Sequence, residues 1–413
     1  MPHSFRTLED IIDNGFCIGC GLCKALAPGA VITMVESENG HLRPRASNPI
    51  QTEQEAAIMR LCPGINIHGP FGKTMGDADP VWGAVKRVAR GHAADPDTRF
   101  RAAAGGIMTA LSQFLVESGR VSKVLQVRAD PENAVASRPV ANRDAESVLA
   151  SSGSRYATCA TLERLPDILA EGEPIAVAMK PCDIAAIRNL QAENERARKL
   201  IVCTIALFCG TVPSLEASDD FLARRGLTRN DIVEFRWRGH GCPGPTYART
   251  ADGREFEGAY REFWVDNHWT TQFRCKICPD AVGLQADIAT GDAWPGGWPK
   301  GEDDGWNMLI AHTEVGEHLL ADCEAAGKIW LEDSDIEFVS DTQPHHVSLR
   351  RALAARLAAG RIAGLPEPNF SDLGLNACAA GLDPDTLAKN FAGTLRRIRA
   401  GQGDEAVKAD YAD

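Results

Sequence analysis

The 413-residue sequence lacks an excess of positive charge, a long apolar run and a leader-like beginning. Its formal net charge is −12 at pH 7, which argues against a basic face for the phosphates of nucleic acid. The longest apolar run, Leu200–Phe208, is far too short to cross a bilayer and is rich in β-branched residues, which predicts a buried strand. Residues 1–13 contain no basic stretch followed by an apolar one. We therefore expect no nucleic-acid partner and no membrane anchor.

Internal repeats, low-complexity tracts and the usual glycine fingerprints for nucleotides are also absent. Neither a G-x-G-x-x-G nor a Walker A sequence of the usual form occurs, which argues against a standard Rossmann or P-loop site. The chain does contain thirteen cysteines. Their spacing and the missing leader argue against a secreted disulfide framework, so we expect a protein of the reducing cytoplasm.

The most informative feature is a run of three cysteines followed by a distant Cys-Pro: Cys17, Cys20, Cys23 and Cys62-Pro63. This C-x2-C-x2-C run is typical of ferredoxin-like sites, in which such thiolates hold three corners of a 4Fe-4S cube and a remote Cys-Pro supplies the fourth. Gly19 and Gly21 let the backbone wrap closely and direct N–H groups at the cluster sulfurs. Zinc is the main alternative, but zinc knuckles usually add a second close pair or histidines, and neither lies between Cys23 and His41.

A second set of cysteines is available from three loops. It comprises Cys275 and Cys278 in Cys-Lys-Ile-Cys-Pro, Cys182 in Lys-Pro-Cys-Asp, and Cys209 at the end of a predicted strand, with Cys242 as the alternative fourth ligand. Four soft ligands suit either a 4Fe-4S cluster or zinc, and strand ends are where α/β proteins place functional groups. Alternatively, Cys182 and Cys209 are ordinary buried thiols. The cysteines without partner spacing are expected in the core: Cys159, Cys203, Cys323 and Cys378.

The chain is long enough for two or three domains, and its 44% apolar composition is that of an ordinary globular protein. Residues 1–75 are expected to form a ferredoxin-like 4Fe-4S domain, in which residues 69–72 look like a linker into the rest of the chain. Residues 81–340 alternate short strands with helical stretches, which predicts an α/β body within a fold that is α+β overall. Residues 341–413 are expected to form a helical tail that packs on the body or on a neighbouring subunit. The elements predicted most clearly are strands at 124–127, 175–179 and 201–208, and helices at 107–117, 184–190, 347–359 and 386–400.

Two loops are suited to a large anionic cofactor. Gly105-Gly106 opens an apolar helix, whose free N–H groups favour negative charge, and the segment from Ser151 to Tyr156 offers hydroxyls, a flexible turn and Arg155. Both segments could hold a pyrophosphate. Each is weak alone, because a Gly-Gly pair before a helix is also a common turn.

The order of several motifs resembles the coenzyme F-420 hydrogenase/dehydrogenase beta-subunit family. That family looks to include the ferredoxin-dependent divinyl chlorophyllide and 7-hydroxymethyl chlorophyll reductases and beta subunits of some formate dehydrogenases. The resemblance covers about residues 10–340 and is carried by the segments 103–111, 152–156, 180–184, 206–210, 275–278 and 286–292.

The resemblance implies an FAD in the α/β body, held without a classical dinucleotide fingerprint, and one or two 4Fe-4S clusters. The residues that it implies for FAD are Gly105, Gly106, Thr109, Ser152, Gly153, Ser154, Arg155, Tyr156 and Lys180. For the inner cluster it implies Cys182, Cys209, Cys275 and Cys278. The segment 291–298 departs from the pattern of the chlorophyll reductases, which weakens a tetrapyrrole substrate.

The segment 236–244, Arg-Trp-Arg-Gly-His-Gly-Cys-Pro-Gly, is the candidate substrate loop. Arg236, Trp237 and Arg238 suit a carboxylated or aromatic substrate, and His240 is a candidate proton donor because its reference pKa lies near neutrality. The alternative is a strand with exposed cations, a buried Trp237, a glycine-rich turn and a hydrogen-bonded surface histidine.

These observations predict an iron–sulfur flavoprotein oxidoreductase. Ferredoxin or another low-potential donor would supply electrons through the clusters to FAD, and reduced flavin would give a hydride to a small organic substrate. A second hypothesis is an electron-transfer beta subunit of a hydrogenase or formate-dehydrogenase-like complex, and a third is a zinc-stabilised binding module without enzyme activity. Under the first two hypotheses the protein is expected to be a homo-oligomer or a subunit of a complex.

Overall fold

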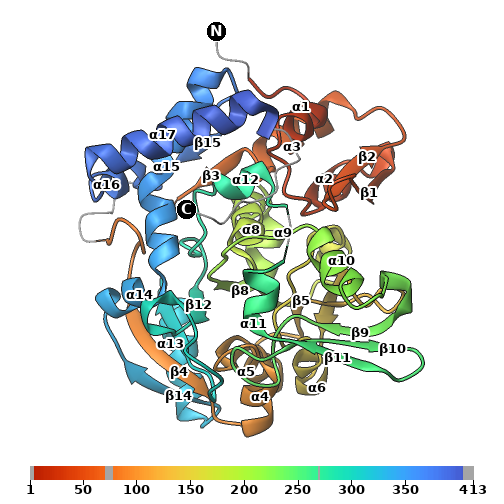
Figure 1. Cartoon of the computed structure of the whole chain (residues 1–413), viewed down its shortest axis with the longest axis vertical. Helices are drawn as coiled ribbons and strands as arrows, with labels where there is room; N and C mark the ends of the chain where they lie inside the picture. Colours follow the sequence, from red (N-terminus) through yellow and green to blue (C-terminus); the bar gives the residue numbers. More distant parts are fainter. Residues whose placement is uncertain (1–3, 70–77, 268–269, 403–413) are drawn as a thin grey trace.

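The computed structural model describes residues 4–69, 78–267 and 270–402. In Figure 1 the N-terminal elements and the C-terminal helices occupy one end of the molecule, and the strands of the central sheet extend from there to the opposite end. None of the helices in the described part of the chain is long and apolar enough to cross a membrane. Pro70 to Gly72 of the predicted linker lie outside the described residues.

The centre of the body is an eight-stranded mixed sheet with the order β14-β4-β13-β12-β8-β7-β5-β6. Its four central strands, β12, β8, β7 and β5, are parallel to one another, and each strand outside them pairs antiparallel with its neighbours. The strands are β4 (Arg87–Ala93), β5 (Lys123–Ala129), β6 (Ser137–Asn142), β7 (Ile175–Met179), β8 (Ile201–Leu207), β12 (Ile288–Asp292), β13 (Asn307–Ala311) and β14 (Ile329–Asp333). The predicted strands at 124–127, 175–179 and 201–208 are thereby confirmed, with β8 ending at Leu207.

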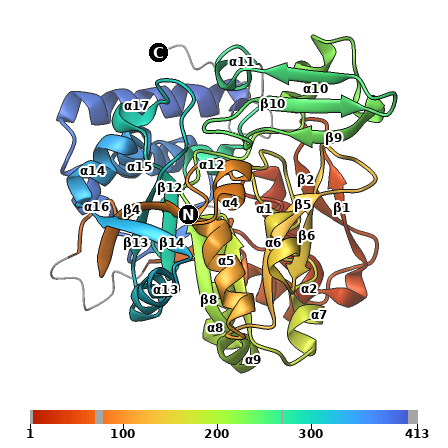
Figure 2. The same cartoon turned by 90° about the horizontal axis from the view of Figure 1, so that it is seen from below.

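Helices cover both faces of this sheet, as Figure 2 shows from below. Apolar side chains of α5 (Ile107–Glu117) and α13 (Glu314–Ala325) form one core with the strands, and those of α8 (Pro181–Glu193) pack in the core of the other face. Pro181 at the start of α8 separates strand from helix, because proline fits the first helical turn but cannot donate to a strand ladder. The prediction of an α/β body is confirmed. The other helices of the body are α4 (Pro96–Arg101), α6 (Ala145–Leu149), α7 (Leu165–Ala170) and α9 (Glu195–Leu200).

The N-terminal segment is small and packs against the body. Its elements are α1 (Leu8–Asp13), α2 (Leu22–Leu26), η1 (Pro28–Ala30), β1 (Ile32–Glu36), β2 (Leu42–Ala46), α3 (Thr52–Leu61) and β3 (Asn66–His68). β1 and β2 form an antiparallel hairpin. The ferredoxin-like architecture expected of residues 1–75 stays a prediction, as do the domain limits 81–340 and 341–413.

A three-stranded antiparallel sheet projects from the body with its own apolar core, which includes Phe221, Phe235 and Trp237. It joins α10 (Glu216–Ala223) to the segment that carries the second cysteine pair. The elements of this region are η2 (Arg229–Asp231), β9 (Ile232–Arg236), β10 (Thr246–Thr250), β11 (Glu255–Gly258), α11 (Tyr260–Trp264), α12 (Phe273–Lys276) and η3 (Pro295–Gly297).

The tail is helical, as predicted, but it also contains a short strand that the sequence did not indicate. β15 (Asn369–Ser371) pairs in parallel with β3, so the tail is attached to the N-terminal segment as well as to the body. The predicted helices at 347–359 and 386–400 correspond to α15 (Pro344–Ala363) and α17 (Pro384–Arg397), the second of which ends three residues early in a π turn. The other tail elements are α14 (Ile336–Thr342), α16 (Leu375–Ala379) and η4 (Ile398–Gln402).

Candidate functional site

The structure gathers the first four predicted ligands, here called the N-terminal thiols: Cys17, Cys20, Cys23 and Cys62. All four line one small cavity whose other walls are mainly apolar side chains from α1, α2 and α3. Gly19 and Gly21 both have positive φ, at 70° and 79°. A Cβ atom on Gly19 would lie 2.6 Å from the Leu42 carbonyl oxygen. The tight wrapping that the glycines predicted is therefore present, and only glycine fits at position 19.

Burial and mutual repulsion disfavour ionisation of three N-terminal thiols, Cys20, Cys23 and Cys62. Burial raises the pKa of Cys20 and Cys23 strongly and that of Cys62 to about 12, and the neighbouring thiols raise these pKa values further. Backbone N–H groups that point at the sulfurs lower the pKa values, among them the N–H of Leu22 at Cys20 and that of Gly64 at Cys62. Four thiolates so close together need a cationic partner, and the N–H groups around them are the groups that hydrogen-bond cluster sulfurs.

The second set, here called the inner thiols, is also brought together: Cys182, Cys209, Cys275 and Cys278. Cys182 lies in the first turn of α8, directly after β7, and Cys209 lies just after β8. Because β7 and β8 are adjacent and parallel, both thiols stand at the carboxyl edge of the sheet, as their positions in the sequence predicted. Burial raises the pKa of Cys209 well above its usual range, and the three other inner thiols raise it further.

Cys242, the alternative fourth ligand, lies apart from the inner thiols. It is buried with Ala104 and Trp294, and the charged groups nearest to it are Asp292, Arg238 and Asp303. The structure thus favours Cys209 for the fourth position, because Cys209 follows a strand whose end faces Cys182. The prediction of core positions is confirmed by the burial of Cys159, Cys203, Cys323 and Cys378.

Among residues 4–69, 78–267 and 270–402, no three Cys, His, Asp or Glu side chains form a group that could hold a single metal ion. A cubane holds its four thiolates farther apart than a mononuclear site does, since each sulfur binds a different iron atom. The assignment of iron–sulfur clusters therefore depends on the spacing in the sequence and on the gathering of four thiols at each place.

Buried polar atoms without partners lie on the segments that carry the inner thiols. Lys180 Nζ contacts Asp183 Oδ2 at 2.5 Å, yet Asp183 Oδ1 has no hydrogen-bond partner among the described residues. The same holds for the hydroxyl oxygens of Thr211, shortly after Cys209, and of Thr271, shortly before Cys275. Unsatisfied polar atoms at this depth are costly and indicate a polar ligand at the site. The region beside the inner thiols fits a cofactor with many hydrogen-bonding groups.

The residues that the resemblance implies for FAD are arranged less uniformly. Gly106, with φ of 80°, begins α5, but the first N–H of that helix, on Ile107, already donates to Asn307 Oδ1 at 3.2 Å. Arg155 donates to Ser137 Oγ and to the carbonyl oxygens of Ala134 and Ala136, so its guanidinium is bonded to the segment that leads into β6. What remains for a pyrophosphate is the backbone after Ile107 and the half-buried hydroxyls of the segment 152–154. Thr109, in the first turn of α5, is buried.

Arg238 in the candidate substrate loop is fully engaged within the protein. It makes two bonds to Asp292, at 2.9 and 3.0 Å, and others to Tyr156 Oη and to the carbonyl oxygens of Ala103 and Pro243. These contacts use all five N–H donors of a guanidinium. Arg238 therefore joins the loop to the start of α5, to Tyr156 and to the end of β12, and it has no donor left for a substrate.

The other members of the loop differ in exposure. Trp237 is buried with an indole nitrogen that has no partner among the described residues, and Arg236 is half-buried beside the Tyr247 ring. His240 is exposed, has a φ of 58° and lies 5.3 Å from the Phe100 ring centroid. Burial, Arg236 and Arg101 lower the pKa of His240, so at neutral pH its ring is in the form that accepts a proton.

Sequence reasoning missed two buried arginines that lie between the two groups of thiols, Arg43 and Arg274. The one available signal was that Arg274 directly precedes Cys275. Arg43 is far from every cysteine in the sequence, and only the fold brings it to the site.

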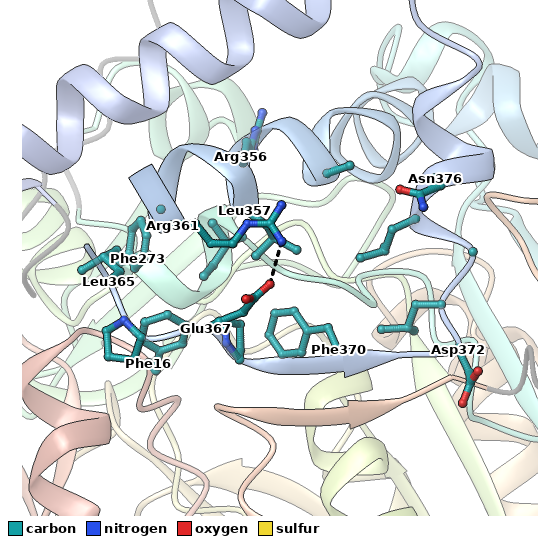
Figure 3. A pocket seen from close by; sticks show the side chains of 18 of the residues that line it. Phe16, Phe273, Arg356, Leu357, Arg361, Leu365, Glu367, Phe370, Asp372 and Asn376 are labelled. Atoms are coloured by element: carbon teal, nitrogen blue, oxygen red, sulfur yellow. Dashed lines mark hydrogen bonds and ion pairs between the residues drawn. The ribbon is translucent and has the colours of Figure 1, made fainter. Parts of the chain in front are cut away.

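A cavity of about 540 Å³ lies between the tail and the segments that bear the thiols (Figure 3). One wall comes from α15 and residues 364–377, and the opposite wall includes Phe16 and Ile277, which directly precede Cys17 and Cys278. Arg361 and Glu367 form an ion pair of 2.8 Å across part of the lining. The cavity has the size of a small-molecule site.

Comparison with known proteins gives consistent matches along the body. Residues 88–166 match the family model of the coenzyme F420 hydrogenase/dehydrogenase beta subunit N-terminus, and residues 172–337 match the model of its C-terminus. A coenzyme F420-dependent sulfite reductase of Methanocaldococcus jannaschii is 24% identical over 79% of this chain and 49% of its own length. The beta subunit of F420-dependent formate dehydrogenase 1 of Methanococcus maripaludis is 28% identical over 57% of this chain and 59% of its own length.

A chain from the F420-reducing [NiFe] hydrogenase complex of Methanosarcina barkeri shares the fold, with a TM-score of 0.55 and 20% identity over 71% of this chain and 99% of that one. The chain spans about half the length of the sulfite reductase that it matches. Together the two family models cover most of the chain, from strand β4 to helix α14. The chain therefore belongs to the coenzyme F420 hydrogenase/dehydrogenase beta-subunit family.

Proposed function

We propose that this protein is an iron–sulfur flavoprotein oxidoreductase that passes electrons between a one-electron carrier and a two-electron carrier. The observation that carries the proposal is the gathering of two groups of four thiols, buried or half-buried, in one chain, one at the N-terminal segment and one at the carboxyl edge of the sheet. Membership in a family of hydrogenase and dehydrogenase beta subunits supports the same chemistry.

Two 4Fe-4S clusters fit the donor sets, since each group offers four soft ligands. When bound, such clusters accept and release single electrons. The protein's part is to hold the thiolates and direct backbone N–H groups at their sulfurs. The N–H groups that do so at the N-terminal thiols belong to Leu22, Lys24, Gly64 and Ile65.

A flavin, proposed here to be FAD, fits beside the inner thiols because of the unpaired polar atoms there. When bound, a flavin connects one-electron with two-electron chemistry. Lys180 and the threonine hydroxyls supply hydrogen-bond donors, and the start of α5 offers N–H groups to a phosphate. His240, exposed and neutral, is suited to accept a proton from a substrate or to relay one from water.

We propose one partner that supplies single electrons and another that exchanges electron pairs. Ferredoxin or a similar low-potential donor suits the N-terminal thiols, and a small organic molecule suits the cavity beside the tail. A second candidate is an electron-transfer beta subunit of a larger complex that uses coenzyme F420. The names of the relatives favour it, since the formate dehydrogenase relative is a beta subunit and the sulfite reductase is about twice the matched length.

The test begins with protein purified without oxygen. We expect iron and acid-labile sulfide in amounts that correspond to two clusters, together with a stoichiometric flavin. Reduction with dithionite should bleach the flavin, and addition of oxidised coenzyme F420 should restore its colour if the beta-subunit proposal is correct. Zinc in place of iron, with no flavin, would contradict the redox proposals and favour a zinc-stabilised binding module.

A further inference from the structure

Arg274 connects the two groups of thiols through its backbone and its side chain. It belongs to α12 and directly precedes Cys275, one of the inner thiols. Its side chain reaches the N-terminal segment, where Nε donates to the carbonyl oxygen of Gly64 at 2.7 Å and Nη2 donates to that of Pro63 at 2.9 Å. Pro63 and Gly64 directly follow Cys62. One arginine thus joins the loops that carry a thiol of each group.

The loop held by Arg274 is the same loop that directs N–H groups at a sulfur. The N–H groups of Gly64 and Ile65 hydrogen-bond Cys62, and a Cβ atom on Gly64 would lie 3.2 Å from the Cys62 sulfur. With its carbonyl oxygens fixed by a guanidinium, this loop keeps its N–H groups on the opposite side, toward the thiol. Arg274 therefore helps to set where Cys62 stands.

The guanidinium of Arg274 is buried without a carboxylate partner among the described residues. The side chain is 1% exposed, its hydrogen-bond acceptors are the two carbonyl oxygens, and its remaining contact is the Phe370 ring, 4.7 Å away. Phe370 lies on β15, the short strand that pairs with β3. A buried cation without a counter-charge is costly, so an anion is expected close by.

The groups that can supply this negative charge are the thiols on either side. Arg274 is bonded to the two carbonyl oxygens that directly follow Cys62 and is next to Cys275 in the chain, which places its charge close to a thiol of each group. A second buried arginine, Arg43, is bonded to the same segment of the chain. It donates to Gln272 Oε1 at 3.2 Å, two residues before Arg274.

We propose that Arg274 is a positioning residue shared by two iron–sulfur clusters, whose reduction potentials it raises together. The proposal rests on the proposed function. A cluster with four thiolates carries net negative charge, and reduction adds one electron and no proton, so a fixed buried cation stabilises the reduced state more than the oxidised one. A cation between two clusters acts on both, so its removal shifts both potentials in the same direction.

The test is an anaerobic redox titration of the full chain with dithionite, followed by EPR of the reduced clusters. Arg274→Gln removes the charge but keeps hydrogen-bonding groups, and we expect both midpoint potentials to shift to more negative values. Arg274→Lys keeps the charge and should leave both potentials close to those of the unaltered chain. Arg196→Gln is the matched control, because Arg196 donates in the same way, through Nε and Nη2, to the carbonyl oxygens of Leu169 and Ala170 on the exposed surface.

Unchanged potentials in an iron-replete Arg274→Gln chain would overturn the proposal, and so would equal shifts in Arg196→Gln. The proposal would also be overturned if both Arg274 variants lost iron while the clusters that remain had normal potentials. Arg274 would then have only a structural role. The unaltered chain gives a measurement that needs no variant: with both clusters reduced, spin coupling should broaden the EPR spectrum, and sharp independent spectra would contradict the shared position. An unaltered chain without iron would instead refute the proposed function itself.

Discussion

At the scale of single residues, the two groups of thiols allow each proposed cluster to be removed separately. Cys20 stands in the N-terminal group and Cys209 in the inner group, and neither group contains a spare thiol in the described structure. We expect Cys20→Ser and Cys209→Ser each to lose about half of the bound iron, because a cubane needs all four ligands for stable binding. Iron and sulfide analysis of anaerobically purified protein measures the loss.

Two other cysteines serve as controls for that measurement. Cys323→Ser changes a thiol buried in the core between α13 and the sheet, and Cys242→Ser changes the thiol that lies apart from the inner group. Both should keep their full iron content. If Cys242→Ser lost iron and Cys209→Ser kept it, Cys242 and not Cys209 would be the fourth ligand of the inner cluster.

His41 gives the chain a pH dependence of stability that a single substitution can remove. Burial and then Arg43 lower the pKa of His41 to about 3, and both of its ring nitrogens lack partners among the described residues. The unfolded chain binds a proton at this position below about pH 6.5 but the folded chain does not, so the free energy of unfolding falls as pH falls from 6.5 toward 3. The slope is at most about 1.4 kcal/mol per pH unit.

His41→Leu should therefore flatten the fall in stability between pH 6.5 and pH 4. Urea unfolding at several pH values measures it, and the exposed His318→Leu is the control. An equal slope in the His41 variant and the unaltered chain would show that the folded protein protonates this ring.

At the scale of elements, Asp287 holds the centre of the sheet together. Its Oδ2 accepts from the backbone N–H and the hydroxyl of Thr204 on β8, both at 2.8 Å, and its Oδ1 accepts from Thr313, the N-cap of α13, at 2.8 Å. Arg188 of α8 approaches the same carboxylate at 3.3 Å. One side chain thus connects the start of β12 with a strand and with helices on both faces.

Asp287→Asn should lower the free energy of unfolding by about 2–3 kcal/mol. The amide replaces a charged acceptor by a neutral one, and its NH2 group would face the N–H and hydroxyl donors that the carboxylate now accepts from. Chemical denaturation followed by circular dichroism measures this change. Asp322→Asn, which alters a half-exposed carboxylate on α13, is the control and should cost well under 1 kcal/mol, roughly the value of a surface ion pair. Equal effects of the two substitutions would contradict the bracing role of Asp287.

The elements predicted from the sequence were those with a strong local pattern. β7 and β8 are continuous apolar runs bounded by polar residues and turns, and α5 begins directly after Gly-Gly. β15 could not be predicted in this way, because three residues without alternation become a strand only through their pairing with β3. The early end of α17 likewise has no signal in a sequence that keeps helical spacing to Ala400.

At the scale of the whole molecule, the sequence predicted each thiol loop but not the charges around it. The spacing of Cys17, Cys20 and Cys23 is local and readable, and strand ends indicated Cys182 and Cys209. Arg238 was assigned to a substrate because it is a cation among glycines, whereas its five donors are used inside the protein. Which partner an arginine meets depends on contacts between distant segments, and these are set only when the fold is complete.

The tail shows the same dependence on distant contacts, and Arg350 of α15 is its main attachment. This side chain is fully buried and donates to the carbonyl oxygens of Pro279, Pro80 and Leu373. Pro279 directly follows Cys278, so the arginine joins the tail to the loop that carries an inner thiol. A carbonyl oxygen that loses such a donor in the interior stays unsatisfied.

Arg350→Met should therefore lower the free energy of unfolding by about 3 kcal/mol, the order of loss when charged hydrogen bonds are broken in a core, and should speed the loss of iron from the inner thiols. Arg361→Met tests the same helix at the surface, where an ion pair with Glu367 is half-exposed and contributes little (Figure 3). Urea unfolding and iron release to a chelator give the two readouts. If the tail were only an appendage, both substitutions would have small and equal effects. A large effect of Arg350→Met alone would mean that the C-terminal helices help to hold the thiol loops in place.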